Sequence, residues 1–263
     1  MKNLLIYILI FTFTISQASE HQIEAITEPS KDVSLNFLIS GIIKSIHVKE
    51  GQAIKKDQLL MKLDDRSEKL RIEKLQAEAA DLSLVKLTKL DLEHKRKELS
   101  KLESLYKSKA IPKRDYDMAK FEYESAKVTV ELRENENKVK QIEAKTAEDN
   151  LKLYSLSSPL SGIIEELKIS EGETTKEDSI IRIIKIDPLW IDVPVSHAFS
   201  TQLKVKDQVK VKFENAKVVN ATISHKSSVG DAASRTVLVR IEVENPTLRP
   251  AGERVQVIFD KQK

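Results

Sequence analysis

Five histidines are the side chains of this 263-residue chain best suited to bind a metal ion or move a proton near neutral pH. They stand far apart, at His21, His47, His94, His197 and His225. A zinc site needs three or four nitrogen or sulfur ligands, commonly including two histidines one helical turn apart. No such pair occurs, and the chain has no cysteine to complete a ligand set. The sequence therefore predicts no zinc site.

Other reactive chemistry is no better supplied. After the initiator, the methionines are Met61 and Met118, too few for the thioether clusters that select Cu(I). The chain shows no Ser/His/Asp signature and no phosphate-binding loop among its six glycines. Its 44 basic and 41 acidic residues are interspersed, which does not favour nucleic-acid binding. We expect no bound metal, no cofactor, no nucleic-acid partner and no enzymatic activity.

Two copies of a short motif organise the chain. SGIIKSIHVKEG begins at Ser40 and SGIIEELKISEG begins at Ser161, so the copies are offset by 121 residues and Gly51 matches Gly172. Each copy reads as two short strands joined by a Glu-Gly turn, in which the glycine supplies a left-handed backbone conformation. One such hairpin is marginal in water. We therefore expect the two copies to pack together.

The segment between the copies reads as a long helical hairpin. It contains no glycine between Gly51 and Gly162, and Pro112 stands near its midpoint. Proline is tolerated in the first turn of a helix, so Pro112 marks the start of the return arm. The charged fraction of 32% and the aromatic fraction of 5% favour long solvated helices over one large core. Each arm of about 40 residues would extend roughly 60 Å.

Apolar residues at heptad spacing run along both arms. One series in the return arm is Tyr116, Ala119, Tyr123, Ala126 and Val130, and a second series, on a shifted phase, is Val128, Leu132, Val139, Ile142, Thr146 and Leu153. The outgoing arm carries Ile72, Leu75, Ala79 and Leu82, then Leu92, Leu99, Leu102 and Tyr106. We expect these faces to pack against the opposite arm.

The two ends of the chain differ from its middle. Lys2, an apolar run over 4–15 and Ser16-Gln17-Ala18 form the pattern of a secretory signal peptide, with an uncleaved N-terminal anchor as the alternative. From Pro188 onward, turn signals separate short apolar runs. Strands are expected at 189–195, 209–213, 218–224, 236–243 and 254–259. Several short strands of this kind predict a small β-barrel.

The order of these segments resembles that of the periplasmic adaptor, or membrane-fusion, proteins of tripartite efflux and secretion systems, the RND/HlyD-like family. Two half-motifs that close on each other look like the lipoyl/biotinyl carrier fold, and here a coiled-coil hairpin is inserted between them. The resemblance rests on EPSKDVSLNFLISGIIKSIHVKEGQAIKKDQLLMKLDD, AIPKRDYDMA, SSPLSGIIEELKISEGETTKEDSIIRIIKIDPLWIDVPV and NPTLRPAGERVQVIF. It implies an elongated α+β fold, a lipoyl-like β sandwich split by a long antiparallel coiled-coil α-hairpin and followed by a small β-barrel.

The resemblance also implies a division into domains. The expected parts are a signal peptide (1–18), an N-terminal segment joining the barrel (19–35), the two lipoyl-like halves (36–64 and 157–187), the α-hairpin (65–156) and the β-barrel (188–260). In carrier proteins, the modified lysine is exposed at the turn that joins the two halves. Here that position is occupied by Asp64-Asp65-Arg66, which leads directly into the hairpin. Covalent attachment of a cofactor is therefore not expected.

The resemblance implies that the hairpin tip docks a TolC-like outer-membrane channel. Relatives use an arginine, a leucine four residues on and a serine seven further, which fall here on Lys101, Leu105 and Pro112. The leucine alone is retained, and lysine lacks the bidentate fork of arginine. The expected docking residues are Lys101, Leu105, Lys109, Ile111, Pro112, Lys113 and Arg114. The alternatives are that Leu105 merely packs between the arms and that the basic loop is only a solvated turn.

The remaining partners follow from the same resemblance. It implies a periplasmic location, association with an inner-membrane transporter of RND type through the barrel and the N-terminal segment, and self-association into a ring around the channel axis. Two other readings stay open. A periplasmic coiled-coil spacer or chaperone would explain the hairpin but not the repeated motif at its root. A metal-binding adaptor would need methionine or histidine clusters.

Overall fold

The computed structural model describes residues 21–175, 180–214 and 217–259. The expected signal peptide, 1–18, lies outside the described residues. The chain divides into two compact units, which are treated separately: the first holds the described residues of 1–34, 161–165 and 182–263, and the second those of 35–160 and 166–181. No helix within the described ranges is long and apolar enough to cross a membrane.

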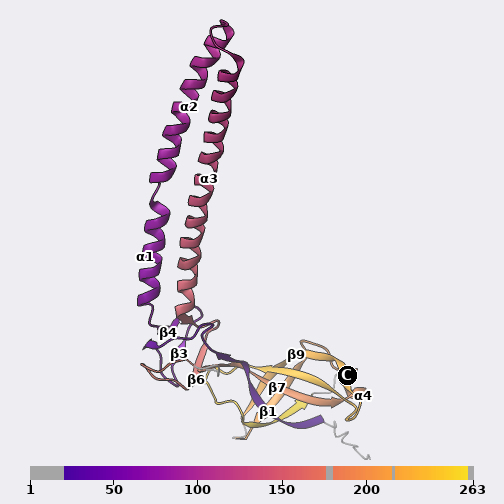
Figure 1. Cartoon of the computed structure of the whole chain (residues 1–263). Helices are drawn as coiled ribbons and strands as arrows, with labels where there is room; N and C mark the ends of the chain where they lie inside the picture. The colour runs from indigo at the N-terminus through magenta and orange to yellow at the C-terminus, as the bar shows by residue number, and fades with distance from the viewer. Residues whose placement is uncertain (1–20, 176–179, 215–216, 260–263) are drawn as a thin grey trace, which may run out of the picture. The chain divides into compact units, whose positions relative to one another are not determined.

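The second unit contains an antiparallel helical hairpin (Figure 1). The outgoing arm consists of two helices, α1 (Arg66–Ala80) and α2 (Ser83–Lys107). The return arm is one long helix, α3 (Lys113–Leu151), followed by the short 3-10 helix η1 (Lys152–Tyr154). The predicted hairpin is confirmed. The interruption between α1 and α2 was not predicted, because the sequence has neither glycine nor proline there.

A face of small residues on α3 packs between the arms. Its buried residues are Ala119, Ala126, Val130, Asn137, Ala144 and Ala147. This face continues the first predicted series at heptad spacing. The prediction that the second series packs inward is wrong. Its members Val128, Leu132, Val139 and Ile142 are between 53% and 64% exposed.

The physical reason is that the inward face keeps one phase along the whole helix. This face includes Arg133 and Asn137, and because both are polar, the apolar pattern of the face is interrupted in the sequence. Ion pairs flank the packed face, with Lys95 Nζ 2.7 Å from Glu122 and Lys89 Nζ 2.6 Å from Glu134. The apolar residues of the shifted phase therefore form a second stripe that points away from the other arm.

A three-stranded sheet of order β2-β4-β5 lies in the same unit. It consists of β2 (Ile43–Ile46), β4 (Leu59–Leu63) and β5 (Ser155–Ser157). In β4, Leu60, Met61 and Leu63 are fully buried. The sheet thus joins the strand that enters the hairpin to the strand that leaves it. β3 (Ala53–Ile54) follows the first Glu-Gly turn, and β6 (Gly162–Leu167) begins the second copy of the repeat.

Asp65 connects this sheet to the hairpin. Its carboxylate is 1% exposed, and the Nζ atoms of Lys62 and Lys69 each lie 2.9 Å from it, with that of Lys44 at 3.5 Å. Burial opposes ionisation, but the hydrogen bonds from Lys62 and Lys69 outweigh it and hold the pKa of Asp65 far below its usual range. The carboxylate is therefore charged, and it ties α1 to β2 and β4.

The two copies of the repeated motif are in direct contact. The backbone N–H of Ile43 donates to the carbonyl of Glu173 at 2.8 Å, and that of Gly172 donates to the carbonyl of Ile43 at 2.9 Å. Gly51 and Gly172 adopt φ angles of 76° and 87°, the left-handed conformation expected at both turns. The predicted pairing of the copies is confirmed.

The first unit is built around a closed antiparallel barrel. Its strands are β1 (His21–Leu35), β7 (Ile181–Ser196), β8 (Gln208–Phe213), β9 (Val218–Asp231), β10 (Thr236–Val243) and β11 (Arg254–Phe259). Their order is β1-β11-β8-β9-β10-β7, and a further pairing of β1 with β7 closes the ring. Alternate residues point inward, so that Ile191, Val239 and Val257 are fully buried. The short helix α4 (His197–Ser200) follows β7.

The predicted strands at 236–243 and 254–259 match β10 and β11. β7 begins earlier than predicted, because a stretch with buried Ile181, Ile183 and Ile186 continues directly into it. β9 ends later than predicted, because it continues past the apolar core into exposed residues. β1 pairs with β11 from His21↔Phe259 to Ile26↔Arg254, so the expected N-terminal segment supplies a barrel strand. β6 and the first residue of β7 fall at the division between the units.

Candidate functional site

The outgoing arm ends at the hairpin tip in a compact capping motif. The N–H of Ala110 donates to the carbonyl of Leu105 at 2.8 Å, and the N–H of Lys109 donates to that of Tyr106 at 2.9 Å. These two bonds are the pair that defines a Schellman motif, which satisfies the last carbonyl groups of a helix. The Ser108 hydroxyl adds a bond to the Leu105 carbonyl at 2.9 Å. The tip loop, residues 107–114, is therefore an ordered turn.

Lys109 occupies the position of this motif that usually requires glycine. Its φ angle is 58°, in the left-handed region. Holding a residue with a Cβ atom there costs on the order of 1–2 kcal/mol. Strain of this kind persists only where the surrounding structure enforces it, and it concentrates at functional sites. The backbone thus holds Lys109, with its charged and exposed side chain, at the point where the chain turns.

The return arm begins immediately after Pro112. Proline at φ −67° and ψ 150° is the residue before the first helical position, and the N–H of Asp115 donates to its carbonyl at 3.2 Å. The prediction that Pro112 lies inside the first turn is therefore off by one residue, because the helix begins at Lys113. Asp115 places a negative charge in this first turn, where it interacts favourably with the positive end of the helix dipole.

The predicted docking residues fall into two groups. The exposed ones are Lys101, Lys109, Pro112, Lys113 and Arg114. Leu105 and Ile111 are only partly exposed. Ile111, the apolar residue of the loop, is therefore partly rather than fully exposed. Leu105 is therefore neither fully exposed nor fully buried between the arms.

Most cations of the tip have no acidic partner. Lys107 is the exception, since its Nζ lies 2.8 Å from Glu103, and this hydrogen bond raises the pKa of Lys107 above its ordinary value. Within the described part of the chain, Lys101, Lys109 and Arg114 form no ion pair. The tip thus presents uncompensated positive charge around a small, partly exposed apolar patch. Such a surface can bind a partner that carries acidic groups beside an apolar pocket.

A stacked tyrosine pair supports the tip and was not predicted. The rings of Tyr106 in α2 and Tyr116 in α3 have centroids 5.2 Å apart and are inclined by 8°. Both residues were assigned to helix faces, but each was considered within its own arm. Their equal distance from Ile111 in the sequence was the signal that could have paired them. The stack joins the arms directly below the tip loop.

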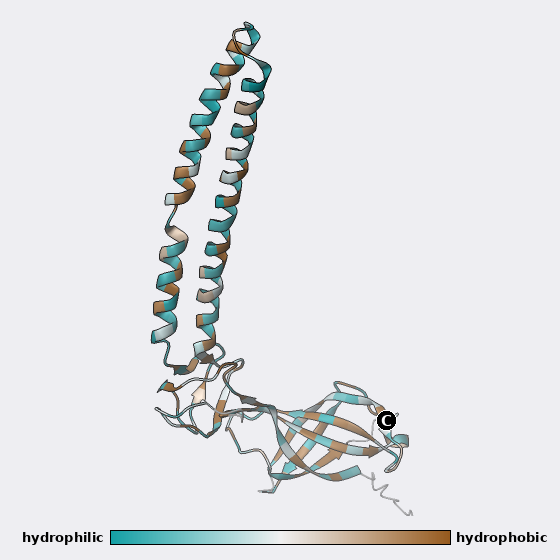
Figure 2. Ribbon diagram, viewed as in Figure 1, coloured by the Kyte–Doolittle hydropathy of each residue, from teal (hydrophilic) through white to brown (hydrophobic). Residues whose placement is uncertain are grey.

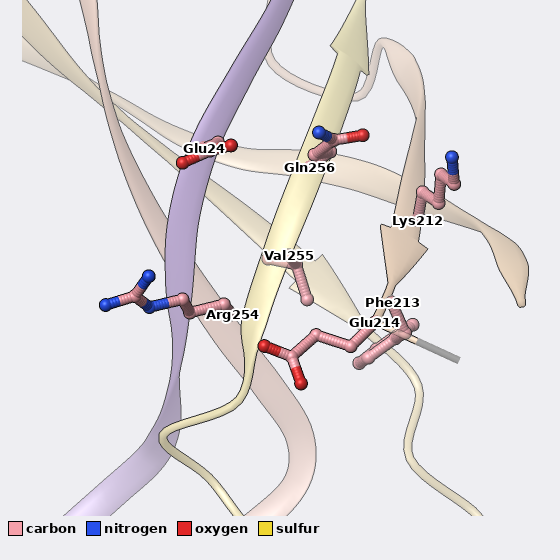
Figure 3. Close-up of a pocket in the computed structure, with 7 residues that line it drawn as sticks. All are labelled: Glu24, Lys212, Phe213, Glu214, Arg254, Val255 and Gln256. Atoms are coloured by element: carbon pink, nitrogen blue, oxygen red, sulfur yellow. The ribbon is translucent and has the colours of Figure 1, made fainter. Parts of the chain in front are cut away.

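A second candidate site is a pocket on the barrel (Figure 3). Glu24 of β1, Lys212 and Phe213 of β8, Glu214, and residues 254–256 of β11 line it. Its two acidic side chains are matched by Lys212 and Arg254, so the pocket has no strong preference for either sign of charge. Among the residues that the structure describes, no group of three or more histidines, cysteines or acidic residues could hold a metal ion.

Comparison with known proteins identifies the fold. The model of the CzcB-like barrel-sandwich hybrid domain matches residues 33–185. The chain belongs to this family. The CusB-like β-barrel domain matches the following residues, 188–263. The family consists of periplasmic adaptor, or membrane-fusion, proteins, as the sequence predicted.

Several relatives share this CzcB-like arrangement. The chain is 24% identical over 218 residues to the cobalt-zinc-cadmium resistance protein CzcB of Cupriavidus metallidurans, which covers 80% of this chain and 38% of CzcB. It is 23% identical over 238 residues to the efflux pump periplasmic linker BepD of Brucella suis, covering 83% of this chain and 57% of BepD. The chain therefore spans between 38% and 57% of these relatives.

The fold is also that of a solved adaptor. The crystal structure of MacA from Actinobacillus actinomycetemcomitans superimposes with a TM-score of 0.79 over 91% of this chain and 78% of that one, at 24% identity. The membrane fusion protein Spr0693 of Streptococcus pneumoniae matches with a TM-score of 0.61 over 92% of this chain, at 12% identity. At these identities the likeness concerns the fold alone.

Proposed function

We propose that this chain is a periplasmic adaptor that links an inner-membrane transporter of RND type to a TolC-like outer-membrane channel. The observation that carries the proposal is the hairpin tip, a strained and ordered turn that holds unpaired cations at the end of two long helices. The capping motif explains the left-handed conformation of Lys109, but it does not require the exposed side chains around it to carry uncompensated positive charge. Binding to a partner with acidic groups would require that charge.

The names of the relatives support the same role. BepD is an efflux pump periplasmic linker, and another relative, from Escherichia coli O157:H7, is the macrolide export protein MacA. We transfer from these names the linking role and the periplasmic location, with the expected signal peptide as the route of export. We assign the contact with the transporter to the barrel and β1, as the resemblance implied.

Self-association into a ring is the second part of the proposal. The second stripe on α3 extends toward the tip through two further apolar residues. Its members are then Met118, Phe121, Val128, Leu132, Val139 and Ile142, all between 53% and 73% exposed. Their spacing follows a heptad repeat, and Figure 2 shows hydrophobic residues recurring along this arm. An exposed apolar stripe of this length marks an interaction surface. A neighbouring hairpin, itself a coiled coil, fits a stripe with this repeat.

The competing proposal is a periplasmic coiled-coil spacer or chaperone without a transport role. It explains the hairpin and the exposed stripe. It gives no reason for the duplicated β motif at the base of the hairpin, nor for Lys101, Lys109 and Arg114 at the tip, which form no ion pair within the described residues. Adaptor function accounts for both, because a subunit that bridges two partners needs a rigid base for its hairpin and a tip whose surface fits its partner.

The test compares export by tip variants with export by a matched control. Leu105→Asp, and the double reversal Lys101→Glu with Arg114→Glu, should abolish export while the protein remains folded and abundant. Loss of a hot-spot contact at an interface costs about 2 kcal/mol or more, whereas exposed substitutions elsewhere change stability by less than about 0.5 kcal/mol. Lys86→Glu, an exposed reversal on α2 away from the tip, should leave export unchanged. Normal export by the tip variants would contradict the docking role.

A further inference from the structure

The outgoing arm contains a joint that the return arm lacks. Helix α1 ends at Ala80 and α2 begins at Ser83, whereas α3 runs unbroken beside both (Figure 1). Between them, Asp81 has φ −75° and ψ 101°, and Leu82 has φ −98° and ψ 11°. Sharp helix breaks normally occur at proline, at glycine or where a side chain enters the hydrogen-bond ladder. Proline and glycine are absent from this stretch, and side-chain hydrogen bonds take up backbone groups on both sides of it.

A side chain bonds to each helix end at the joint. The carboxylate of Asp81 accepts a hydrogen bond from the N–H of Ser83, the first residue of α2, at 2.9 Å, and so satisfies one of the free N–H groups of that helix end. Hydrogen bonds from Ser83 also lower the pKa of Asp81. On the other side, the carbonyl of Ala79, near the end of α1, accepts a hydrogen bond from Asn137 Nδ2 of α3 at 2.9 Å. The last carbonyls of a helix lack intrahelical partners, and this bond replaces one of them.

Asn137 is an unusual residue for its position. It is buried, at 9% exposure, and it lies one heptad after Val130 and one heptad before Ala144 on the face that packs between the arms. A second bond fixes the orientation of its amide, because Gln141 Nε2 donates to Asn137 Oδ1 at 2.8 Å. A buried asparagine at such a coiled-coil position lowers stability but specifies one arrangement of the helices.

The packing beside the joint is open. A groove between α1 and α3 is lined by Ala79, Ala80 and Ala144 together with the polar residues Gln76, Gln141, Lys145 and Glu148. Gln76 donates a hydrogen bond to Glu148 across it. Small side chains and polar bridges hold α1 less firmly than interlocking large apolar residues would. Polar contacts therefore determine how α1 meets α3 here.

We propose that residues 81–82 form a hinge in the outgoing arm and that Asn137 is the positioning residue that latches it. The bond from Asn137 to Ala79 holds α1 at one angle to α2 along the continuous helix α3. In this way it sets the direction in which α2 carries the tip. Only the functional effect of the hinge, which is to orient the tip toward a channel, rests on the proposed function. The hinge itself is a property of the free chain.

The test measures a distance across the joint by pulsed electron paramagnetic resonance. The chain has no cysteine, so spin labels at Leu70→Cys in α1 and Leu90→Cys in α2, 67% and 66% exposed, report on the full chain without background. The parent chain should give one narrow distance. Asn137→Leu, which keeps the branching at Cγ but removes the donor, should shift and broaden it. Asn135→Leu, an exposed asparagine on the same helix, is the control and should match the parent.

A second label pair separates a hinge effect from loss of helix. Labels at Val128 and Ile142, both in α3, should keep their distance in every variant. Asn137→Asp, which also lacks the N–H donor, should reproduce the broadening of Asn137→Leu. A narrow parental distribution across the joint in either variant would overturn the latch. An equal broadening within α3 would overturn it too, since the substitution would then have unfolded the helix itself.

The outcome is independent of whether the tip binds a channel. The distances are measured on the purified chain, whereas the tip variants are assayed by export. A broadened joint together with normal export by Leu105→Asp would leave the hinge standing and remove the docking role. Unchanged distances together with export lost in Leu105→Asp would do the reverse.

Discussion

Glu50 and Glu171 exchange identical hydrogen bonds between the two copies of the repeated motif. Glu50 Oε1 accepts from the N–H of Leu167 at 2.8 Å, and Glu171 Oε1 accepts from the N–H of Ile46 at 2.8 Å. In the repeat, Glu171 is the counterpart of Glu50 and Leu167 is the counterpart of Ile46. The copies are therefore related by an internal two-fold arrangement, and each glutamate of the Glu-Gly turn caps the strand of the other copy.

This exchange predicts matched losses of stability. Glu50→Ala and Glu171→Ala should each lower the free energy of unfolding by about 1 kcal/mol, the typical net value of one hydrogen bond. Urea denaturation followed by circular dichroism measures both. A loss confined to one of the two variants would show that the two hydrogen bonds do not contribute equally to the free energy of unfolding.

The glycine of the same turn gives a second prediction. Gly51 has φ 76°, and a Cβ atom placed there would meet nothing within 4 Å. The cost of Gly51→Val is therefore backbone strain alone, about 1–3 kcal/mol. Gly51→Asn should cost less, because asparagine tolerates the left-handed region. Equal melting temperatures for the parent and Gly51→Val would contradict the turn assignment.

Asp65 predicts a dependence of stability on pH. Its pKa is lower in the folded chain than in the unfolded chain, so the ion pairs contribute fully above the unfolded value, about 3.9, and are lost as pH falls through the folded value. Asp65→Asn should lower stability at pH 7 and flatten the decline of the unfolding free energy below about pH 4. Parallel curves for the parent and Asp65→Asn between pH 5 and pH 2 would contradict this account.

The strain at Lys109 predicts opposite effects on stability and function. Lys109→Gly removes the Cβ conflict at φ 58° and should stabilise the capping motif by about 1 kcal/mol. Hydrogen exchange at the Ala110 amide should slow accordingly. Export should fall, because the variant loses a cation of the proposed docking surface. Faster exchange at Ala110 would mean that the motif does not store this strain.

The outward stripe on α3 predicts weaker self-association when it is charged. Val128→Lys with Leu132→Lys should leave the hairpin helical, since both side chains are more than half exposed. Chemical crosslinking in cells that contain the transporter and channel should then trap fewer multimers. Lys86→Glu on the other arm serves as the control. Unchanged multimers in the stripe variant would assign the ring contact to another surface.

The sequence was sufficient for the parts of the fold that repeat or break a pattern. The duplicated Gly51 and Gly172 turns predicted the paired β copies, and the glycine-free stretch around Pro112 predicted the hairpin. It was not sufficient where polar residues stand at buried positions. Asn137 interrupts the inward heptad series, so the apolar stripe beside it was mistaken for the packed face. The joint at 81–82 was not predicted either, because the stretch contains neither glycine nor proline to mark a break.

The site was predicted as a stretch of sequence but not as a geometry. The resemblance to adaptor proteins predicted the tip as a docking surface, and the structure shows that Leu105 and Ile111 in it are partly exposed. The left-handed conformation of Lys109 could not be predicted, because lysine carries no signal for it. It arises when the carbonyls of α2 are satisfied by a turn that contains no glycine.

Site-specific photocrosslinking from the hairpin tip tests the central claim most directly. A photoreactive amino acid at Ile111 or Lys109, in cells that export a substrate, should form an adduct with an outer-membrane channel. The same group at Leu90, exposed on α2 below the tip, should form none with the channel. Channel adducts from the tip but not from Leu90 are the result that this account predicts. Absence of tip adducts in exporting cells with the chain at normal abundance would contradict it.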